Sequence, residues 1–524
     1  MSKVVSAAEA VGKIREGDTV IWTSVGLAGF CHEVALALEK RFLDTGGPRN
    51  LTIAHDSGCG DGKTPRGMNV VAHEGLVRRL ISGHTGHAPK MGKLINDNLI
   101  EAYLLPQGVM THLWRHVAGK KPGVITKIGL GTYVDPRRGG GKVSPRTTEE
   151  LVKLIELEGE EWLLYKPIPV NVAVIRASVA DERGNLTMER EPLLLEGLPM
   201  AQAARNCGGI VIAQVEYLAK TGTLHPQKVK IPGVLVDYIV VATSPANHMQ
   251  AGTVQFDPAL CGDTRVPLAG MPPLPMGERK IMARRAALEL KPDKLVNLGI
   301  GVPDGISSIA AEEGVLDLLM LTTEVGTYGG MPVSGKDFGC TLNAEAIIEH
   351  HSQFDFYDGG GLDYTFLGMA QVDRFGNVNV SKFGQRVVGS GGFINISQSA
   401  KQAVFCGAFT DGAEIEIRDG QLHIVKEGTT QKFVADVDQI TFSGEYSQKR
   451  NQPVLYITER AVFRLMNGKM TLIEVAPGID VERDVLGQMG FRPEISPQLT
   501  TMPPEIFAAQ WGLLKRHMER QTGA

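Results

Sequence analysis

The stretch Leu321-Thr-Thr-Glu-Val-Gly-Thr-Tyr-Gly-Gly330 decides how the rest of the chain is interpreted. It places Glu324 at the end of an apolar run, Val315 to Leu321, which predicts a buried strand. The glycines that follow allow the backbone to pass close to whatever the carboxylate meets. Two interpretations are open on this stretch alone. Glu324 ends the strand and caps a neighbouring helix, or it is a catalytic group at the carboxyl end of a strand in an α/β protein.

The residues before this stretch predict a strand–loop–helix–strand unit. The segment Asp293 to Leu298 predicts a strand, and it leads into a glycine-rich turn, Gly299 to Gly305. A helix over Ile306 to Glu313 then leads to the strand that ends at Glu324. This is the βαβ pattern of an α/β sheet, in which ligands bind at the carboxyl ends of the strands.

The first half of the chain predicts the same unit. The expected elements are, in order, a helix over 6–16 with Ser6 as N-cap, a strand over 19–24, a helix over 32–43, and a strand over 51–54 followed by the glycine-rich loop 57–62. In this alignment Asp18 corresponds to Asp293, and Leu51-Thr-Ile53 corresponds to Leu319-Met-Leu321. The loop after Ala54 therefore takes the place of the loop that carries Glu324.

A second correspondence supports a duplication. The pattern Asp-x-x-Gly-Asn begins at Asp181 and again at Asp373, and Gln202-Ala-Ala-Arg later matches Gln398-Ser-Ala-Lys. Repeats of this length indicate duplicated domains, not a solenoid. We therefore expect two homologous α/β domains with flanking helices and the site between them. The predicted bounds are 1–244 for the first domain, 245–276 for a proline-rich linker, and 277–524 for the second domain, which carries Glu324.

Composition excludes several classes of protein. The 524 residues are 43% hydrophobic and 21% charged with a net charge of −4, so the chain predicts globular domains and gives no electrostatic case for nucleic acid or an anionic membrane. The six cysteines form no CxxC pair, so neither a disulfide scaffold nor a zinc ribbon is expected. The N-terminal residues lack the apolar core of a signal peptide, and no run of about 18 apolar residues occurs. The expected location is cytoplasmic.

Several motifs favour a structural explanation. Gly299-x-Gly301-x-x-Asp304 fails as a dinucleotide fingerprint because Pro303 stands where the helix should begin, although backbone amides there remain available to an anion. The histidines at 73, 84 and 87 do not form a zincin motif, and we expect them to be structural, with no metal site. We expect Glu349-His-His351 to be a helix end. No Gly-x-Ser-x-Gly elbow is present.

Two further stretches offer groups that suit catalysis. Leu104-Leu-Pro-Gln107-Gly places a neutral amide after a strand and before a helix, where it either caps the helix or donates to a developing oxyanion. Val387-Val-Gly-Ser-Gly-Gly392 precedes an apolar run. Its glycines indicate a backbone that approaches either a ligand or a neighbouring strand closely.

Together these stretches resemble the family I CoA-transferases over the whole chain. The most specific runs are 104–113, 121–137, 297–301, 323–326, 353–363 and 389–396. The resemblance is closest to the single-chain propionate and acetate CoA-transferases. The ketoacid-type enzymes have Ser-Glu-Asn-Gly where this chain has Thr323-Glu-Val-Gly326, and Gly-Gly-Phe-Gly where it has Ser24-Val-Gly-Leu27. These departures favour acetate or propionate over succinyl and acetoacetyl substrates.

The resemblance implies a mechanism and a set of residues. Glu324 would be the nucleophile, and CoA would move between a short-chain acyl-CoA and a free carboxylate through an acyl-glutamyl anhydride and a glutamyl-CoA thioester. The Gln107 side-chain amide and the Gly392 N–H would stabilise the oxyanion, and Gly301 and Gly391 would contact CoA. CoA would be a co-substrate with no permanently bound cofactor, and the protein would be a homo-oligomer, dimer or tetramer.

Three questions stay open at this stage. Lys120-Lys121, Arg137-Arg138 or Lys382 would contact the CoA phosphates, or they are ordinary surface charges. An acyl-CoA hydrolase on the same fold would use Glu324 and finish with water. A sugar-phosphate isomerase or a ligand sensor on a related α/β fold would use Glu324 as a base or a ligand. The amphipathic pattern over 507–518 predicts a helix that packs on its own domain or contacts another subunit.

Overall fold

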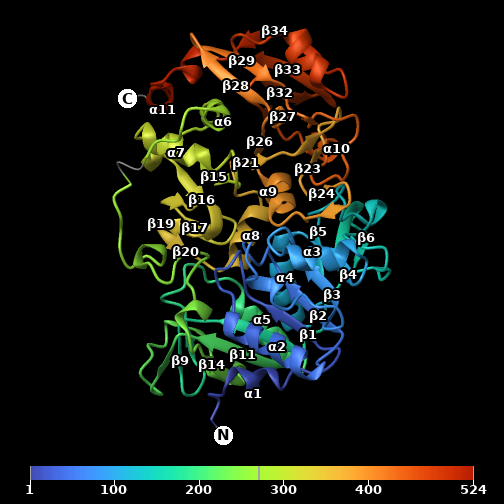
Figure 1. Cartoon of the computed structure of the whole chain (residues 1–524), viewed down its shortest axis with the longest axis vertical. Helices are drawn as coiled ribbons and strands as arrows, with labels where there is room; N and C mark the ends of the chain where they lie inside the picture. The colour runs from blue at the N-terminus through green and yellow to red at the C-terminus, as the bar shows by residue number, and fades with distance from the viewer. Residues whose placement is uncertain (1, 269–271, 523–524) are drawn as a thin grey trace.

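Two α/β domains are stacked along the long axis of the molecule, the first from blue to green and the second from yellow to red (Figure 1). The computed structural model describes residues 2–268 and 272–522. Within these ranges no helix has both the length and the apolar character needed to cross a bilayer. Each domain is built around one large sheet, and the two sheets share a common plan.

The first domain has a seven-stranded sheet in which all neighbours are parallel. Its strands, in spatial order, are β14 (Tyr238–Val241), β11 (Ile210–Val215), β8 (Val172–Arg176), β1 (Thr19–Trp22), β2 (Leu51–His55), β3 (Val77–Ser82) and β4 (Glu101–Leu104). β2 and β8 are buried at every residue. Continuous burial is what a parallel sheet covered by helices on both faces requires.

The second domain has a ten-stranded mixed sheet. Its strands, in spatial order, are β20 (Ala346–Ile347), β17 (Thr327–Tyr328), β16 (Met320–Thr322), β15 (Leu295–Leu298), β21 (Tyr364–Gly368), β26 (Gln402–Cys406), β31 (Val454–Ile457), β32 (Ala461–Met466), β33 (Lys469–Val475) and β34 (Glu494–Thr501). The five strands from β16 to β31 are parallel, and antiparallel pairs extend the sheet on both sides.

Helices cover both faces of each sheet. The helices are α1 (Ala7–Val11), α2 (His32–Thr45), α3 (Pro89–Asn96), α4 (Gln107–Ala118), α5 (Gly197–Asn206), α6 (Glu278–Ala287), α7 (Gly305–Glu312), α8 (His350–Asp358), α9 (Phe393–Ser399), α10 (Gly444–Lys449) and α11 (Leu513–Thr522). In the first domain α1, α2 and α3 share one hydrophobic cluster, while α4 and α5 share the cluster on the opposite face. In the second domain α6, α7 and α11 share one cluster, and α8 and α9 share the other.

Strand order confirms the predicted duplication. The order β14-β11-β8-β1-β2 in the first sheet matches β31-β26-β21-β15-β16 in the second. Thr19 pairs with Thr52 as Leu295 pairs with Met320, so the predicted match of Leu51-Thr-Ile53 to Leu319-Met-Leu321 is confirmed. The predicted match of Asp18 to Asp293 is wrong by one position. Thr52 N–H donates to Asp18 O, and Met320 N–H donates to Lys294 O.

The two Asp-x-x-Gly-Asn loops have the same hydrogen bonds. Asp181 Oδ1 accepts from the backbone N–H groups two and four residues later, and its Oδ2 accepts from the Asn185 side chain. Asp373 repeats all three bonds with its own loop and Asn377. These side chains replace the backbone partners that a tight turn leaves unpaired. Each loop lies in a small antiparallel pair, β9 (Val179–Asp181) with β10 (Leu186–Thr187), and β22 (Gln371–Val372) with β23 (Val378–Asn379).

Some predicted element bounds are wrong. The run from Val315 to Leu321 is not one strand, because residues 316–318 form a 3₁₀ turn and β16 begins only at Met320. The first helix keeps its predicted cap, a capping box between Ser6 and Glu9, but it ends at Val11. The C-terminal helix begins at Leu513, and the apolar side chains at 507, 511, 514 and 518 all pack in the cluster shared with α6 and α7.

The predicted linker is packed against both domains. Residues 245–268 contain two 3₁₀ turns, Pro245–Asn247 and Pro258–Leu260. Gly252 O accepts from Arg66 Nη1 of the first domain at 2.7 Å, and Thr253 N–H donates to Asp337 Oδ1 of the second at 2.7 Å. The predicted domain bounds themselves stay a prediction, and residues 269–271 lie outside the described ranges.

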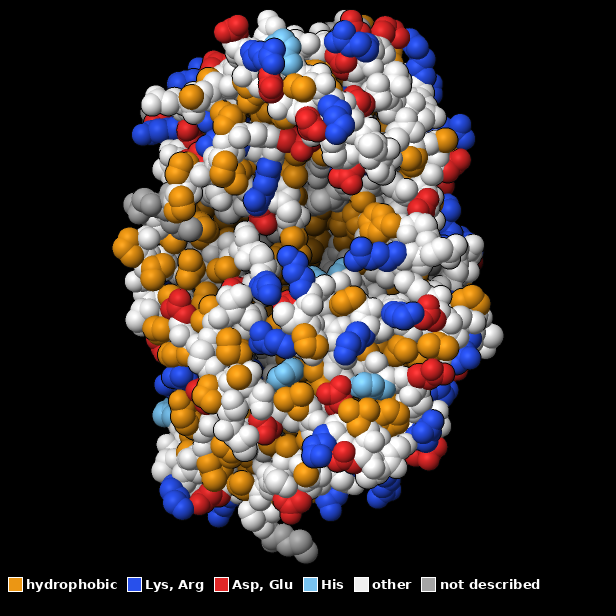
Figure 2. Space-filling model, in the orientation of Figure 1, with side chains coloured by type: hydrophobic (Ala, Val, Ile, Leu, Met, Phe, Trp, Pro, Cys, Tyr) orange, Lys and Arg blue, Asp and Glu red, His pale blue; other side chains and the backbone are white. Residues whose placement is uncertain are grey.

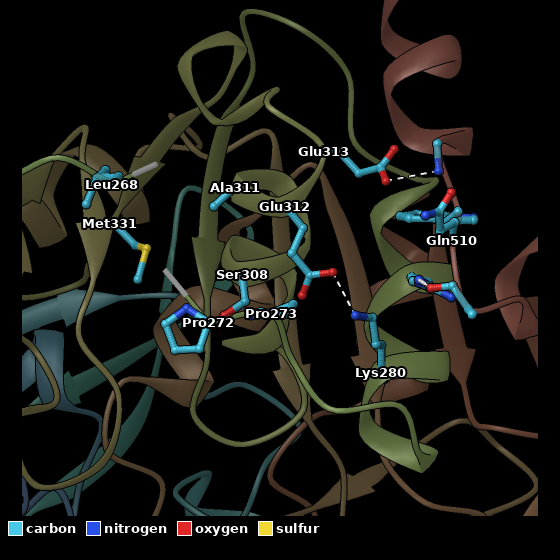
Figure 3. A pocket seen from close by; sticks show the side chains of 14 residues that line it. Leu268, Pro272, Pro273, Lys280, Ser308, Ala311, Glu312, Glu313, Met331 and Gln510 are labelled. Carbon is cyan, nitrogen blue, oxygen red and sulfur yellow. Dashed lines mark hydrogen bonds and ion pairs between the residues drawn. The ribbon is translucent and has the colours of Figure 1, made fainter. Parts of the chain in front are cut away.

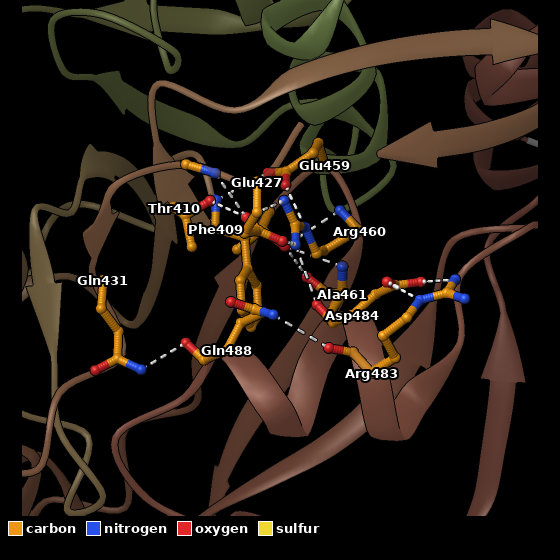
Figure 4. Close-up of polar contacts among 12 residues, drawn as sticks. Phe409, Thr410, Glu427, Gln431, Glu459, Arg460, Ala461, Arg483, Asp484 and Gln488 are labelled. Atoms are coloured by element: carbon orange, nitrogen blue, oxygen red, sulfur yellow. Dashed lines mark hydrogen bonds and ion pairs between the residues drawn. The ribbon is translucent and has the colours of Figure 1, made fainter. Parts of the chain in front are cut away.

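A buried ionic cluster ties the antiparallel extension of the second sheet together (Figure 4). Arg460, in the turn between β31 and β32, is fully buried and donates to Glu459 and Glu427 at 2.7 and 2.8 Å. It also donates to Asp484 O and lies 4.9 Å from the centre of the Phe409 ring. A buried guanidinium requires this many partners because an unpaired charge in the interior is costly.

Candidate active site

Glu324 lies two residues after β16, in a tight turn at the carboxyl edge of the second sheet. Thr323 N–H donates to Thr327 O, Gly326 N–H donates to Thr323 O, and the hydroxyls of Thr323 and Thr327 are 2.7 Å apart. Gly326 has φ +106°, and a Cβ there would lie 2.2 Å from Ile348 O. Only glycine fits this position, so the sequence around Glu324 fixes the direction in which its side chain leaves the strand.

The Glu324 carboxyl is 8% exposed. Burial raises its pKa above the ordinary value, because removal from water disfavours the charged form. Hydrogen bonds from the Glu324 backbone and the Asn297 side chain act in the opposite direction and favour the carboxylate. The group is therefore a partly desolvated carboxylate, which is more reactive as a nucleophile than one in bulk water.

Gln107 is the first residue of α4 and only 1% exposed. Its backbone N–H donates to Gly391 O at 3.0 Å, which attaches the start of α4 to the glycine run of the second domain. Its side-chain Nε2 donates to His350 Nε2 at 2.9 Å. One amide hydrogen is thereby used, and the second is free for a ligand.

Gly392 is the N-cap of α9 and lies against Glu324. A Cβ at Gly392 would lie 3.3 Å from Glu324 Cγ and 3.1 Å from Ile396 Cδ1. The N–H groups of Gly391 and Phe393 donate to Gly83 O and Ser390 O, whereas the Gly392 N–H has no partner among the described residues. A backbone donor beside the carboxylate is therefore available. The glycine run also forms a bridge from Gly389 to His84, so it approaches both a neighbouring strand end and the cavity.

Glu324, Gln107, Gly391 and Gly392 all line one cavity of about 250 Å³ between the domains. Figure 2 shows the molecule hollowed near its middle, with hydrophobic side chains beside the hollow. The first domain contributes Val25, Gly26, Ser57, Gly58, His84, His87 and Gln107, and the second contributes the remaining lining residues, among them Asn297, Ile300, Phe338 and Phe393. Gly301 is not among the lining residues. It is exposed and its N–H donates to Asp304 Oδ2, while Gly299 and Ile300 line the cavity instead.

Three histidines at this site escaped the sequence prediction. His84 and His87 line the cavity with their rings 4.9 Å apart, and their Nδ1 atoms have no partner among the described residues. Burial lowers the pKa of His84 to about 3, so it is neutral near pH 7. His350 begins α8 and contacts Gln107, although Glu349-His-His351 was predicted only as a helix end. No local pattern distinguishes His350, because its partners Gln107 and Glu196 lie more than 150 residues away.

The basic residues suggested for CoA phosphates lie elsewhere. None of Lys120, Lys121, Arg137, Arg138 and Lys382 lines the described wall of the cavity. Arg137 is paired with Asp135 and Glu161. The structure therefore gives these five residues no connection with the cavity around Glu324.

A larger cavity of about 620 Å³ lies between α6, α7 and the C-terminal segment (Figure 3). Its charged side chains are occupied: Lys280 pairs with Glu312 at 2.7 Å, and Glu313 accepts from Gly512 N–H at 3.0 Å. Arg284 donates to the carbonyls of Ile506 and Ala508. None of the predicted site residues lines it.

Comparison with known proteins agrees with this geometry. The family model described as Coenzyme A transferase matches residues 4–242 and 279–486. Caffeate CoA-transferase of Acetobacterium woodii is 51% identical over 98% of each chain, and acetate CoA-transferase YdiF of Escherichia coli K12 is 43% identical over 96% of this chain and 95% of its own.

A solved structure is similar over nearly the same range. The acyl-CoA transferase YdiF of Escherichia coli O157:H7, in a thioester complex with CoA, matches with a TM-score of 0.91 and 41% identity. The match covers 98% of this chain and 97% of that one. The duplicated fold, the cavity between the domains and these relatives lead to one conclusion: the chain belongs to the coenzyme A transferase family.

Proposed function

We propose that this CoA-transferase moves CoA between a short-chain acyl-CoA and a free carboxylate, with Glu324 as the covalent nucleophile. The observation that carries the proposal is a buried carboxylate that lines the same cavity as two available donors from opposite domains. These donors are the second amide hydrogen of Gln107 and the Gly392 N–H. The solved structure of the 41% identical YdiF is a thioester complex with CoA, which supports a covalent route.

The overall exchange of CoA proceeds through a series of separate acyl transfers. A Glu324 oxygen attacks the thioester carbon, and the C–S bond breaks to give an acyl-glutamyl anhydride and CoA thiolate. The thiolate attacks the glutamyl carbonyl, and the first carboxylate leaves, so a glutamyl-CoA thioester remains. An incoming carboxylate runs the same two steps in reverse, which frees Glu324.

The two donors stabilise the negative charge that develops in each of these steps. Each attack passes through a tetrahedral oxyanion, and a preorganised donor contributes roughly 3–4 kcal/mol to its stabilisation. Gln107 and Gly392 reach the site from helices of different domains, so the donors are in place only when the domains are together. Gly391, between them, lines the cavity and is proposed to contact CoA.

Exclusion of water decides between transfer and hydrolysis. Both acyl intermediates react with water, and the nucleophile is nearly buried. We therefore favour transfer over the alternative of an acyl-CoA hydrolase. Acetate or propionate is the proposed acid, in agreement with the acetate relative. Caffeate is a second candidate because a 51% identical relative is named for it.

A single labelling experiment tests the route. The protein is incubated with acetyl-CoA without an acceptor, reduced with borohydride and mapped by peptide mass spectrometry, and Glu324→Gln serves as the control. The expected result is a mass change confined to the wild-type peptide that contains Glu324. Turnover with no modified peptide would contradict the covalent mechanism. Acyl-CoA loss that persists at the same rate without a carboxylate would favour the hydrolase.

A further inference from the structure

Because the two domains repeat one plan, the residues of the candidate active site have equivalent residues in the other domain. Four residues after the paired positions Thr52 and Met320 stand Asp56 and Glu324, each beyond the end of an equivalent strand. The equivalent helices α5 and α9 have Glu196 and Gly392 as their N-caps.

The third pair of equivalent residues lies at the starts of helices α4 and α8. In chain order α4 comes before β8 and α8 comes before β21, two strands that hold the same place in the repeated strand order, and each helix shares a cluster with the helix that follows it. Their first residues are Gln107 and His350. Asp56, Glu196 and His350 are therefore the repeat counterparts of Glu324, Gly392 and Gln107. The two sets meet where Gln107 Nε2 lies 2.9 Å from His350 Nε2.

The counterpart set is closed to substrate. Asp56, Glu196 and His350 are 1%, 2% and 0% exposed, and none of them lines the cavity around Glu324. A glutamate side chain stands where the active set has a glycine. Asp56 Oδ1 accepts from Trp114 Nε1 at 2.6 Å, so that carboxyl is anchored to α4. A second acyl-transfer site is thereby excluded.

Two of these residues, Glu196 and His350, form a chain of contacts that ends at Gln107. Asp56 lies beside them within 4.8 Å. Glu196 Oε2 lies 2.7 Å from His350 Nδ1, and the His350 backbone N–H donates to Leu195 O at 3.2 Å. Leu195 has φ +52°, in the left-handed region that a non-glycine residue seldom adopts. Two consecutive residues of the first domain therefore hold one residue of the second, and one of them does so in a strained conformation.

Hydrogen-bond logic assigns the histidine tautomer. An amide nitrogen only donates, so His350 Nε2 accepts from Gln107 and its proton resides on Nδ1, which donates to Glu196. Burial lowers the pKa of His350 and raises the pKa values of Asp56 and Glu196, so the ring stays neutral and the carboxyl pair retains a proton. With an acceptor at this place, the Gln107 carboxamide turns its nitrogen toward His350 and its oxygen toward Gly391, and one amide hydrogen is left to donate.

We propose that the Asp56–Glu196–His350 set is a positioning device, derived from the duplicated site, that fixes the orientation of the Gln107 carboxamide for catalysis. This inference rests on the proposed role of Gln107. Without the histidine acceptor, the carboxamide would be free to turn over, and the exchange of its NH₂ group and its oxygen would remove the donor that the developing oxyanion needs.

A metal ion explains these contacts less well. The ligand atoms of the three residues lie within 4.8 Å of one another, which suits a cation. Both ring nitrogens of His350 are, however, already within hydrogen-bond distance of Gln107 and Glu196. A bound metal would need at least one of these two contacts to open.

Two substitutions at His350 separate its two roles. His350→Gln retains an acceptor at the end of the side chain for Gln107, whereas His350→Asn retains a donor near Nδ1 for Glu196 and leaves Gln107 without a partner. We expect His350→Asn to lower kcat about 10–10²-fold, less than the 10²–10³-fold that complete loss of a donor causes. His350→Gln should recover most of the rate. KM for acetyl-CoA should change by less than about threefold in both variants, because the acceptor acts on the transition state.

A double-mutant cycle tests whether His350 acts through Gln107. In a Gln107→Ala background, His350→Asn should lower kcat by less than about twofold. A further drop equal to that seen alone would overturn the proposal, as would equal rates for His350→Gln and His350→Asn. Thermal melts of all variants identify losses due to misfolding. One equivalent of zinc in the purified wild type, absent from His350→Asn, would overturn the proposal in favour of a metal site.

These outcomes are distinct from failure of the proposed function. If Glu324→Gln or Gln107→Ala retains wild-type transfer, the proposed chemistry fails before His350 is considered. If both variants lose transfer and the cycle shows additive effects, the chemistry stands and only the positioning role of His350 is refuted.

Discussion

At the scale of single residues, the site combines a buried carboxylate with glycines that have no room for a side chain. Gly392 has φ −78°, so its backbone would accept any residue, and only the space beside Glu324 Cγ and Ile396 Cδ1 excludes one. Its role therefore differs from that of Gly326, which needs glycine for its conformation as well. A substitution at 392 therefore displaces the Glu324 side chain without straining the backbone.

Gly392→Ala should lower kcat by at least about tenfold and leave the fold intact. Neighbours must shift by a few tenths of an ångström, and misplacement of reacting groups by 1 Å costs up to about 10²-fold. Gly92→Ala in α3 is the matched control, since its Cβ would meet nothing within 4 Å and should change kcat by less than about twofold. Steady-state kinetics and thermal melts check both variants, and an unchanged rate for Gly392→Ala would refute close packing against Glu324.

The titration of Glu324 gives a second prediction at this scale. Only the carboxylate is a nucleophile, and burial raises its pKa above the ordinary 4.5. kcat/KM for acetyl-CoA should therefore fall as pH drops through a pKa higher than 4.5, which the pH–rate profile of the free enzyme reports.

The same shift has a consequence for stability. A carboxyl whose folded pKa is raised binds its proton more tightly when folded, so its penalty is absent at low pH and develops as pH rises through the unfolded and then the folded pKa. Glu324→Gln, which carries no charge, should be at least as stable as the wild type at pH 7. A lower melting temperature for this variant would contradict the assigned direction.

At the scale of secondary structure, four helices point their N-termini at one region. The first residues or N-caps of α4, α5, α8 and α9 are Gln107, Glu196, His350 and Gly392, which contact one another or Glu324. Helix N-termini carry about half a positive charge each, which favours negative charge on Glu324 and on the oxyanion. Repetition of a βαβ unit produces this convergence, because both domains place these helix ends at the carboxyl edges of facing sheets.

Elements whose partners are near in sequence were predictable. The capping box at Ser6, the Asp-x-x-Gly-Asn loops and the helix after Pro106 depend on residues within a few positions. The apolar run before Glu324 was misjudged because Leu316 and Leu318 continue its apolar pattern, although residues 316–318 turn as a 3₁₀ segment. Gln107 and Gly392 were implied by family resemblance. His350 was missed because its partners, Gln107 and Glu196, lie more than 150 residues away.

The buried ion pairs of Arg460 lead to a prediction about the stability of the strand extension of the second sheet. Arg460→Ala should lower the free energy of unfolding by about 3–5 kcal/mol, because it leaves Glu459 buried without its cation. Arg418→Ala removes an exposed pair with Glu416 and should cost less than about 1 kcal/mol. Urea titrations of both variants measure the difference, and equal losses would show that burial of the cluster does not govern its contribution.

At the scale of the whole molecule, the segment between the domains packs against the residue that follows Glu324. One hydrophobic cluster joins Val25 and Leu195 of the first domain, Ala251 and Leu260 of the predicted linker, and Val325, the residue after Glu324. A flexible tether would not be buried in this way. The position of Glu324 relative to the first domain therefore depends on a segment that composition alone marked as a linker.

Leu260→Ala tests this dependence. Leu260 is 4% exposed, and a leucine truncated in a packed cluster costs about 2–5 kcal/mol. Because the resulting cavity adjoins Val325, we expect kcat to fall as well, by about tenfold, while the melt remains a single transition. Leu43→Ala is the control of equal chemistry on a side chain that is 63% exposed, and it should change stability by less than about 0.5 kcal/mol and leave kcat unchanged. A Leu260→Ala variant that loses stability but retains full kcat would show that the linker holds the domains together without positioning Glu324.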